Sequence, residues 1–525
     1  MTTFTDPVTV TGDSTYTLAA GDILDVTGDA ALIWEGTDTN DTINNAGLIT
    51  GSSDNSLVIG TTPVTGTLAF NNLAGATVAS EMDLRDLTAG ATVTITNAGL
   101  FNAVSSHAMR FAEDGGSVIL NNEATGVITA ADASEDVLKD GSNTTINNYG
   151  KIISSGDEFD AFGLPSQTGG DAIDFGEGTN NLVHNFAGGI IAASHHGVTS
   201  DFGATVINDA GAQIIGHNGA GLNFDNAADG DTLADLQDKI LIVTNHGTIL
   251  GESQTYEDSD GDAIDTDGLV DVDNYGFIGG LGANGEHDGG TNHSEALAIG
   301  GGTVNNFAGG SIYSVQRGIQ VDDSAEGPAL AATTIMNAGT IQASGGWEAI
   351  QIVGDQNDTL TNSGTIIGDI LMGGGTDKVT LKTGSNIVGE IHLGEGNDTI
   401  KGSAGSELIY GDAGKDNLTG GAGADTFFFA EGDSGKTKTA ADTIFDFTKS
   451  DTIDLTGFDA NTTKNGDQDF TFIGDDAFHN KAGELRFVEE KSDTYIYGDT
   501  NGDGKADFAI HLDDAVSLKA GYFDL

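Results

Sequence analysis

Four consecutive nine-residue units with one shared pattern constrain the fold of this chain more than any other feature. Residues 393–428 read LGEGNDTIK, GSAGSELIY, GDAGKDNLT and GGAGADTFF, and each unit is an imperfect copy of Gly-Gly-x-Gly-x-Asp-x-U-x, in which U is a large apolar residue. A flexible glycine-rich linker has no reason to place an apolar residue at every ninth position, whereas a stack of short strands joined by tight turns does. The pattern therefore predicts a parallel β-roll that binds calcium in its turns.

The residue types in these turns are those that suit a hard cation. The glycines allow backbone carbonyls to converge, and the acidic side chains add charged oxygen ligands, which together favour Ca2+. The apolar residues Ile400, Ile409, Leu418 and Phe427 are expected to point inward. The candidate metal-binding residues of the repeats are Gly394, Gly396, Asp398, Glu407, Gly411, Asp412, Gly414, Asp416, Gly420, Gly421, Gly423 and Asp425.

The charge of the chain excludes several classes of partner. Its 525 residues include 80 acidic and 19 basic side chains, a formal charge of −61. Nucleic acids and anionic membranes need clustered Lys and Arg, so we expect neither as a partner. Because 38% of the residues are hydrophobic and fall in regular short runs, we expect a folded chain whose charge divalent cations partly neutralise. Cysteine is absent, which excludes disulfides and thiolate metal sites.

The N-terminal sequence and the hydropathy pattern bear on localisation. The first residues, MTTFTDPVTVTGDST, lack the basic and apolar segments of a secretory signal, and no run approaches the length of a membrane span. We therefore expect no insertion into a membrane. If the protein leaves the cell, its export must depend on a signal elsewhere in the chain.

The chain before residue 371 is built from a second repeat. The string apolar-x-Asn-x-Gly-x-Ile recurs at intervals of 23 to 37 residues, and a second short apolar pair, as in residues 172–175 and 349–352, lies between copies. This spacing suits the coils of a parallel β-helix, each with at least two strands, and we expect a right-handed one. The repeated asparagines are Asn45, Asn72, Asn97, Asn122, Asn148, Asn185, Asn208, Asn245, Asn274, Asn306, Asn337 and Asn362.

The repeated asparagine has a structural explanation that needs no ligand. Stacked Asn amides can hydrogen-bond from one coil to the next, so we predict an internal ladder. The extra length of the 148–185 and 208–245 intervals should form loops that leave the coil. The acidic segment 257–262 is either a further calcium loop or, as we favour, a solvated one.

The β-helix and the roll are expected to be continuous. Residues 367–377 read IGDILMGGGTD and residues 388–398 read VGEIHLGEGND, so a 21-residue unit repeats once and merges into the nonamers. Asp377 thereby takes the place of Asp398 and joins the candidate metal ligands. We divide the chain into a β-helix (1–371), a calcium roll (372–428) and a C-terminal cap with the secretion signal region (429–525).

One loop of the cap resembles half of an EF-hand loop. Residues 499–507 read DTNGDGKAD, which places oxygen ligands at Asp499, Asn501, Asp503 and Asp507. Ile510 stands where a bidentate Glu would complete the loop, so the alternatives are a partial calcium site and an acidic hairpin turn.

Residues 393–525 resemble the C-terminal region of RTX proteins, especially the roll and cap of serralysin-type metalloproteases. The similarity includes the nonamers, then DTIFDF, DTIDL, AGELRF and NGDGKADFAIHL, and an end in YFDL. It implies Ca2+ binding, an extracellular bacterial location, and export by a type I secretion system whose ABC transporter recognises an uncleaved C-terminal signal. Residues 1–371 resemble instead the β-helical repeats of bacterial surface proteins.

Enzymatic activity is the main alternative to a structural role. The zinc-protease signature His-Glu-x-x-His is absent, so the protease activity of serralysins does not carry over. A polysaccharide lyase or epimerase needs grouped cations, but the six basic residues before 371 fall on coils that we expect to be distant from one another. A hydrolase needs two carboxylates in one cleft. The acidic residues that flank strands are Asp171, Asp174, Asp265, Asp322 and Asp323.

The pair His195 and His196, with His184 and His217 nearby in the sequence, is the other place for a site. Strand alternation would point one of the pair inward and one outward, so we favour a solvated loop over a two-histidine metal site. We therefore expect a secreted, non-catalytic protein of the cell surface, such as an adhesin, surface-layer or matrix component. Its expected partners are calcium, further copies of itself in an assembly, or a cell-surface polysaccharide. The alternative is an extracellular glycoside hydrolase, lyase or epimerase on a β-helix.

Overall fold

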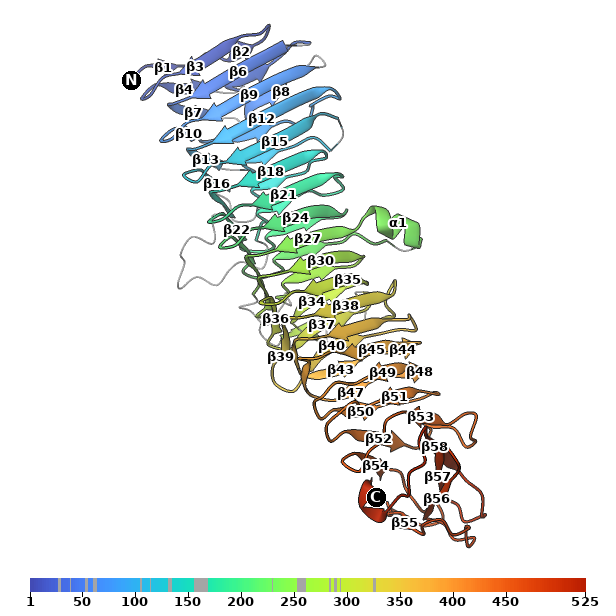
Figure 1. The fold of residues 1–525 in the computed structure, drawn as a ribbon. Helices are drawn as coiled ribbons and strands as arrows, with labels where there is room; N and C mark the ends of the chain where they lie inside the picture. The colour runs from blue at the N-terminus through green and yellow to red at the C-terminus, as the bar shows by residue number, and fades with distance from the viewer. Residues whose placement is uncertain are drawn as a thin grey trace. The chain divides into compact units, whose positions relative to one another are not determined.

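The fold is nearly all-β, and parallel strands dominate it (Figure 1). The computed structural model describes all residues except 27–29, 38, 52–54, 60–63, 104–105, 114, 131–134, 155–168, 229, 253–260, 283–284, 288–289, 293 and 324–326. The chain forms two compact units: unit 1 contains residues 1–300 and 310–316, and unit 2 contains residues 301–309 and 317–525. The helices of the described residues are all too short or too polar to cross a membrane.

Unit 1 is a parallel β-helix in which each coil contributes one strand to each of three sheets. Sheet A contains β1 (Thr3–Phe4), β4 (Ile23–Val26), β7 (Leu48–Gly51), β10 (Thr77–Val78), β13 (Leu100–Ala103), β16 (Val127–Ala130), β19 (Lys151–Ser154), β22 (Ile190–Ala193), β25 (Gln213–Gly216), β28 (Thr248–Gly251), β31 (Phe277–Gly280) and β36 (Ser311–Ser314). Sheet B contains β2 (Val8–Val10), β5 (Leu32–Trp34), β8 (Asn55–Ile59), β11 (Glu81–Asp83), β14 (Met109–Arg110), β17 (Leu138–Lys139), β20 (Ile173–Asp174), β23 (Val198–Ser200), β26 (Leu222–Phe224), β29 (Ile264–Thr266) and β34 (Glu295–Ile299). Sheet C contains β3 (Thr15–Leu18), β6 (Thr39–Asn45), β9 (Gly66–Asn72), β12 (Ala91–Asn97), β15 (Ser117–Asn122), β18 (Thr144–Asn148), β21 (Asn181–Asn185), β24 (Ala204–Asn208), β27 (Leu241–Asn245) and β30 (Val270–Asn274).

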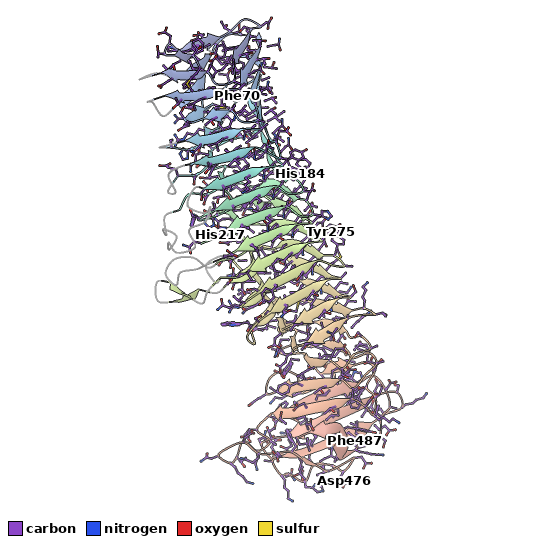
Figure 2. All side chains as sticks on the ribbon, turned by 90° about the vertical axis from the view of Figure 1, so that its left-hand side faces the viewer. Phe70, His184, His217, Tyr275, Asp476 and Phe487 are labelled. Carbon is purple, nitrogen blue, oxygen red and sulfur yellow. The ribbon has the colours of Figure 1, made fainter. Side chains whose placement is uncertain are left out.

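Period-two alternation explains why these segments form strands around one core. In β12, every second side chain from Ala91 to Asn97 is buried, and the residues between them are half-exposed. Parallel pairing in constant register then stacks like positions, so that Ile43, Phe70 and Ile95 lie one above the other with at most 1% of their surface exposed (Figure 2). The interior is therefore a continuous pile of aliphatic and aromatic side chains.

The predicted internal asparagine ladder is confirmed. In unit 1, the Nδ2 of Asn45 donates to the Oδ1 of Asn72 at 2.9 Å, and the same bond recurs from coil to coil as far as Asn274. Unit 2 has its own ladder, from Asn306 through Asn337 to Asn362, whose amide donates to the hydroxyl of Ser385. The ladder satisfies buried amides that would otherwise be costly.

The extra length of the 208–245 interval leaves the coil, as expected. It contains α1 (Leu233–Asp238), which a capping box at Thr232 and Asp235 begins. The corresponding part of the 148–185 interval, and residues 257–260 of the acidic segment, lie outside the described residues. A small hairpin pairs β32 (Gly285–His287) with β33 (Gly290–Asn292).

Unit 2 begins as a β-helix and narrows into the roll. Its part of sheet A contains β39 (Thr340–Ala343), β42 (Thr365–Ile367) and β46 (Asn386–Val388). Its part of sheet B contains β37 (Arg317–Val321), β40 (Glu348–Ile352), β43 (Asp369–Leu371), β47 (Ile391–His392), β50 (Leu408–Tyr410), β52 (Thr426–Ala430), β54 (Thr452–Gly457) and β59 (Phe523–Asp524). Its part of sheet C contains β35 (Gly302–Asn306), β38 (Thr333–Asn337), β41 (Thr359–Asn362), β45 (Lys378–Leu381), β49 (Thr399–Lys401), β51 (Asn417–Thr419), β53 (Asp442–Ile444), β58 (Phe508–Leu512), β57 (Thr494–Asp499), β56 (Glu484–Glu489) and β55 (Thr471–Phe472).

The passage from coil to roll is continuous within unit 2. Strand β41 pairs with β45, β45 with β49 and β49 with β51, all in parallel. A short pair, β44 (Gly374–Gly375) and β48 (Glu395–Gly396), joins the turns of neighbouring coils. The third strand of the coil is lost because a nonamer is too short to cover three sheets, so successive nonamers alternate between sheets C and B. The inward residues of all four nonamers, at the positions expected, are fully buried.

The end of unit 2 is an antiparallel cap. Strands β56, β57 and β58 pair antiparallel, and β58 pairs in parallel with β53. The 3₁₀ helix η1 (Ala520–Tyr522) precedes β59, which pairs with β54. The cap thus covers the last strands of the roll.

Candidate functional site

A column of aspartates runs along the turns that precede the sheet C strands of unit 2. The backbone N–H of Asp377 donates to the Oδ1 of Asp398 at 2.7 Å, and that of Asp398 donates to the Oδ1 of Asp416 at 2.8 Å. The same bond extends upward to Asp358 and downward to Asp442. Each carboxylate is therefore fixed by the backbone of the preceding coil, and Asp377 occupies the place expected from the 21-residue repeat.

A second, shorter column lies beside the sheet B strands. The backbone N–H of Glu407 donates to the Oδ1 of Asp425 at 2.9 Å, and that of Asp425 donates to Asp451 at 3.1 Å. Two columns arise because successive nonamers alternate between the two sheets.

One oxygen of almost every carboxylate in these columns has no hydrogen-bond partner among the described residues. These atoms are buried, and a buried acceptor without a donor is costly for folding. They are Oδ2 of Asp358, Asp377, Asp398, Asp416, Asp425 and Asp442 and Oε2 of Glu407. A stack of unsatisfied anionic oxygens fits a divalent cation that prefers oxygen ligands, so the residues present fit Ca2+.

The electrostatics of the columns support the same interpretation. Burial raises the pKa of Asp377 to about 8, and repulsion from Asp398 adds to the effect. Burial likewise raises the pKa of Asp416 to about 8, with repulsion from Asp442 and Asp398. Bound cations would offset this repulsion, because a positive charge beside the carboxylates favours their ionised form.

The glycines of the nonamers allow the turns to stack closely. Gly396 and Gly414 have φ values of 150° and 152°, and a Cβ on Gly414 would collide with the carbonyl oxygen of Gly396 in the neighbouring turn. This close approach brings backbone carbonyls of adjacent turns together beside the carboxylate columns. Substitution of these glycines would separate the turns.

Two groups of the candidate calcium ligands, Asp412 and those of the cap loop, lie outside the two carboxylate columns. Asp412 points toward His392, and it lies 3.3 Å from the Nδ1 of that residue rather than in either column. In the cap loop, Asp499 accepts from Gly502 and Gly504, and Asp507 accepts from Thr500 and Asn501. Asn501 and Asp503 also accept hydrogen bonds from the loop backbone. These bonds are those of an acidic hairpin turn, and calcium binding there remains a prediction.

The sequence analysis missed Asp358, Asp442 and Asp451 as column members. The signal that finds them is the triplet Asp-Thr followed by a large apolar residue, which also occurs at Asp398 and Asp425. In each case the aspartate ends the turn and the apolar residue begins the buried row of the strand. The triplet also occurs outside the columns, as at Asp41, Asp231 and Asp493, so it finds the column members only beside the roll.

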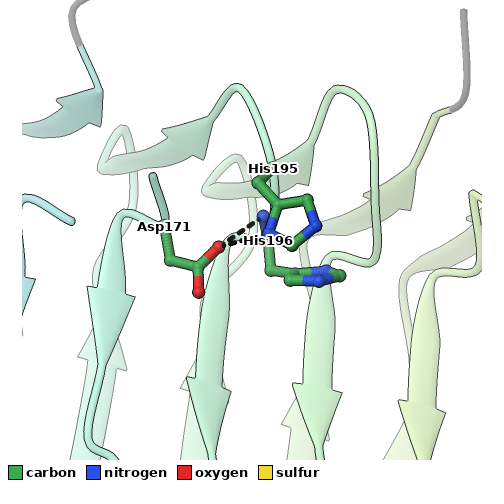
Figure 3. A group of neighbouring side chains, drawn as sticks. All are labelled: Asp171, His195 and His196. Carbon is green, nitrogen blue, oxygen red and sulfur yellow. Dashed lines mark hydrogen bonds and ion pairs between the residues drawn. The ribbon is translucent and has the colours of Figure 1, made fainter. Parts of the chain in front are cut away.

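A second cluster of charged side chains lies on unit 1, where sheet A turns into sheet B. Asp171 accepts from the Nδ1 of His195 at 3.0 Å and from the backbone N–H of His196 at 2.9 Å (Figure 3). Burial alone would raise the pKa of Asp171, but these two hydrogen bonds hold it below its usual range. The expectation that strand alternation separates the two histidines was wrong, because both lie in a bend between β22 and β23.

The donor set of this cluster does not fit a three-ligand metal site. The Nδ1 of His196 accepts a hydrogen bond from the backbone N–H of Ala220 at 2.8 Å, so its Nε2 carries the proton. Burial lowers the pKa of His196 to about 4, which keeps this ring neutral. His184 and His217 do not complete the site: His184 lies on β21 of sheet C, on the side opposite His217 in Figure 2, and His217 pairs with Glu252 at 2.8 Å.

Basic residues are closer together here than the sequence indicated. Arg110 and Lys139 occupy paired positions on β14 and β17, so the expectation that they lie on distant coils was wrong. Lys139 contacts both Asp136 and Asp174, the latter on the next coil. The cation is thus neutralised by the carboxylates around it and is poorly suited to bind an anionic sugar.

The comparison with known protein families supports the resemblance of the C-terminal region. Residues 340–521, which are 182 of the 525 residues, match the family model described as Peptidase M10 serralysin C terminal. No curated protein matches the chain. The matched segment contains both carboxylate columns, and a C-terminal region of this family implies that the protein is secreted.

Proposed function

We propose that this chain is a secreted protein whose roll binds Ca2+ and folds after export, and whose β-helix serves as a non-catalytic component of the cell surface, an adhesion structure or the extracellular matrix. The observation that supports calcium binding is the row of buried carboxylate oxygens without partners in the two columns. The residues that would hold the ions are the column carboxylates and the carbonyls of the glycine turns. The ion would supply the positive charge that the columns lack.

Calcium binding would also set where the protein folds. At the low free calcium of a cytosol the columns repel one another, whereas millimolar calcium outside the cell supplies binding energy that becomes folding energy. The chain would then pass a type I transporter unfolded and fold outside. The match to a secreted family supports this order of events.

Refolding of the full chain tests the calcium dependence. The protein is diluted from urea into EDTA or into millimolar Ca2+, and trypsin sensitivity after Lys401 and Lys415, both within the roll, is followed by mass spectrometry. We expect rapid cleavage in EDTA and protection in Ca2+. Equal protection in both conditions would refute the proposal.

The proposed structural role of the β-helix is supported by buried polar groups that bond from coil to coil. The asparagine ladders, and the hydrogen bonds of Asp171 and His196 to backbone N–H groups of neighbouring coils, are contacts that hold coils together. Its proposed partners are further copies of the chain or a cell-surface polysaccharide. Neither partner requires a reactive group.

A second candidate function, a polysaccharide-active enzyme, is favoured by one observation. Oxygens of Asp136, Asp171 and Asp174 lie within 4.8 Å of one another, next to His195. Glycoside hydrolases use two carboxylates in one cleft, about 5–5.5 Å apart in retaining enzymes. The full chain with Ca2+ should be assayed for release of reducing ends from neutral and uronic polysaccharides, with Asp174→Asn as the inactive control; turnover that Asp174→Asn abolishes would establish the enzyme.

A further inference from the structure

A groove of about 340 Å3 crosses the outer face of sheet B in unit 2, where the coils give way to the roll. Its exposed apolar surface comes mainly from half-exposed Leu371, beneath which Ile352 and Met372 are buried. Carboxylates of Glu348, Asp369 and Asp412 and the ring of His392 complete the lining. Apolar surface beside a few polar groups, in a volume of this size, is typical of sites that bind small organic ligands.

A stack of aromatic rings extends from His392 at one end of the groove. Leu371, His392, Tyr410 and Phe428 occupy paired positions on successive strands. The rings of His392 and Tyr410 stack at 4.0 Å, and those of Tyr410 and Phe428 lie 4.5 Å apart. Glu390 and Asp412 bond to the two ring nitrogens of His392 and fix its orientation. The wall of the groove is therefore rigid before any ligand binds.

Asp412 occupies a repeat position at which other nonamers carry glycine. Its φ is 56°, in the left-handed region, where the equivalent Gly394 and Gly421 have φ values of 93° and 95°. Glycine adopts this conformation without strain, whereas aspartate does so at a cost. The Oδ2 of Asp412 accepts the backbone N–H of Gly394 at 3.2 Å, and this bond between neighbouring turns offsets part of the cost. The carboxylate belongs to neither column and also lines the groove, and strained residues of this kind concentrate at functional sites.

We propose that this groove binds a neutral saccharide. Carboxylate oxygens accept hydrogen bonds from sugar hydroxyls through lone pairs that their present partners leave open, and the C–H face of a sugar ring packs on half-exposed Leu371.

The charge of the lining selects among saccharides. Three carboxylates face one histidine, so uronic, sulfated and phosphorylated glycans are repelled. Glu348 is paired with Arg317, and His392 is paired with Glu390 and Asp412, so these groups already have charged partners and the site keeps a net negative charge. A neutral hexose or pentose polymer fits this balance. The inference rests on the proposed function, because part of the groove belongs to the calcium roll.

A fluorescent reporter lies beside the groove. Trp347 precedes Glu348, and the only other tryptophan, Trp34, is fully buried in unit 1. The full chain in millimolar Ca2+ is titrated with cello-, malto- and xylo-oligosaccharides, with glucosamine oligomers and with oligogalacturonates, and tryptophan emission and calorimetry are followed. We expect saturable binding of at least one neutral series and none of the acidic series.

Two variants make the test specific. Asp412→Gly removes a groove carboxylate but restores the residue that the backbone prefers, so we expect at least a tenfold weaker sugar affinity with an unchanged calcium midpoint for folding. Leu371→Ala removes a half-exposed apolar side chain from the lining of the groove and should also weaken binding. Glu395→Gln, on the exposed surface of the same roll, should bind as the parent protein does.

The outcomes separate the two proposals. Three results would overturn the saccharide proposal and leave the calcium roll intact. The first is calcium-dependent folding without binding of any neutral series, and the second is stronger binding of the amino or acidic series. The third is an unchanged sugar affinity in Asp412→Gly. Loss of the calcium response itself would instead overturn the proposed function.

Discussion

Asp416→Asn should change the stability of the roll in opposite directions with and without calcium. Asn keeps an oxygen to accept the N–H of Asp398, and it replaces the unpartnered Oδ2 by a neutral amide. In EDTA the substitution removes a buried carboxylate that is forced to take up a proton on folding. In Ca2+ it removes a charged ligand.

The magnitude follows from the pKa. A carboxyl whose pKa rises from 3.8 to about 8 destabilises the fold at pH 7.5, by about 5 kcal/mol at most, since each unit corresponds to about 1.4 kcal/mol. Neighbouring carboxylates share this penalty, so we expect Asp416→Asn to stabilise the calcium-free roll by about 2 to 5 kcal/mol. In Ca2+ we expect the affinity of the site to fall more than about tenfold, or about 1.4 kcal/mol.

Hydrogen–deuterium exchange of the full chain measures both effects locally. Peptides that cover β49 and β51 report the opening free energy of the roll, while peptides from unit 1 serve as an internal reference. Glu395→Gln removes one charge from the exposed surface of the same roll and should change neither value by more than about 0.5 kcal/mol. A destabilisation of similar size in both conditions would refute the reasoning, because it would mean that Asp416 acts only through its hydrogen bond.

Four further predictions concern the roll, the ladder and assembly. Because burial raises the pKa of Asp377 and Asp416 above the values of the unfolded chain, their contribution to the stability of the calcium-free roll should be full below about pH 4 and be lost as the pH rises from there to 8, whereas calcium affinity should rise over the same range; exchange at pH 5 and pH 8 measures both. The double variant Asp416→Ala, Asp425→Ala should bind fewer calcium ions in calorimetry, while Glu395→Gln on the exposed surface of the roll serves as control; an unchanged stoichiometry in the double variant would contradict the assignment. Asn122→Ala should destabilise unit 1 by about 2 to 4 kcal/mol because it removes the acceptor of one Asn97 hydrogen bond and the donor to the buried Oδ1 of Asn148, whereas outward-facing Asn121→Ala should cost under about 1 kcal/mol; urea unfolding of the two variants compares them. Sedimentation in millimolar Ca2+ should show oligomers that EDTA dissociates, since the charge of −61 opposes association without bridging cations; a strict monomer would favour adhesion by single molecules.

Much of the fold can be predicted from the sequence because the sequence patterns that specify it are local and repeated. The period-two alternation, the Asn-x-Gly turns and the nonamers each specify one coil, and constant register stacks the coils. The asparagine ladder followed from the same logic. Stacking a coil on its neighbour needs no information from distant parts of the chain.

The missed features depend on neighbours that the sequence does not specify locally. Asp358 and Asp442 lack the glycine pattern, and only the register of β41, β45 and β53 with the roll places them in the column. His195 and His196 lie in a bend, where strand alternation gives no direction. Asp412 matched a repeat position, but its positive φ and its contact with His392 turn its carboxylate away from the columns.

The central claim is that the unpartnered oxygens of the two columns bind calcium. Crystals of the full chain grown with Ca2+, and anomalous diffraction recorded from them, test it directly. We predict calcium peaks within about 2.3–2.6 Å of the Oδ2 atoms of Asp398, Asp416 and Asp425. Ordered columns without anomalous density at those atoms, in crystals that hold millimolar calcium, would contradict the account.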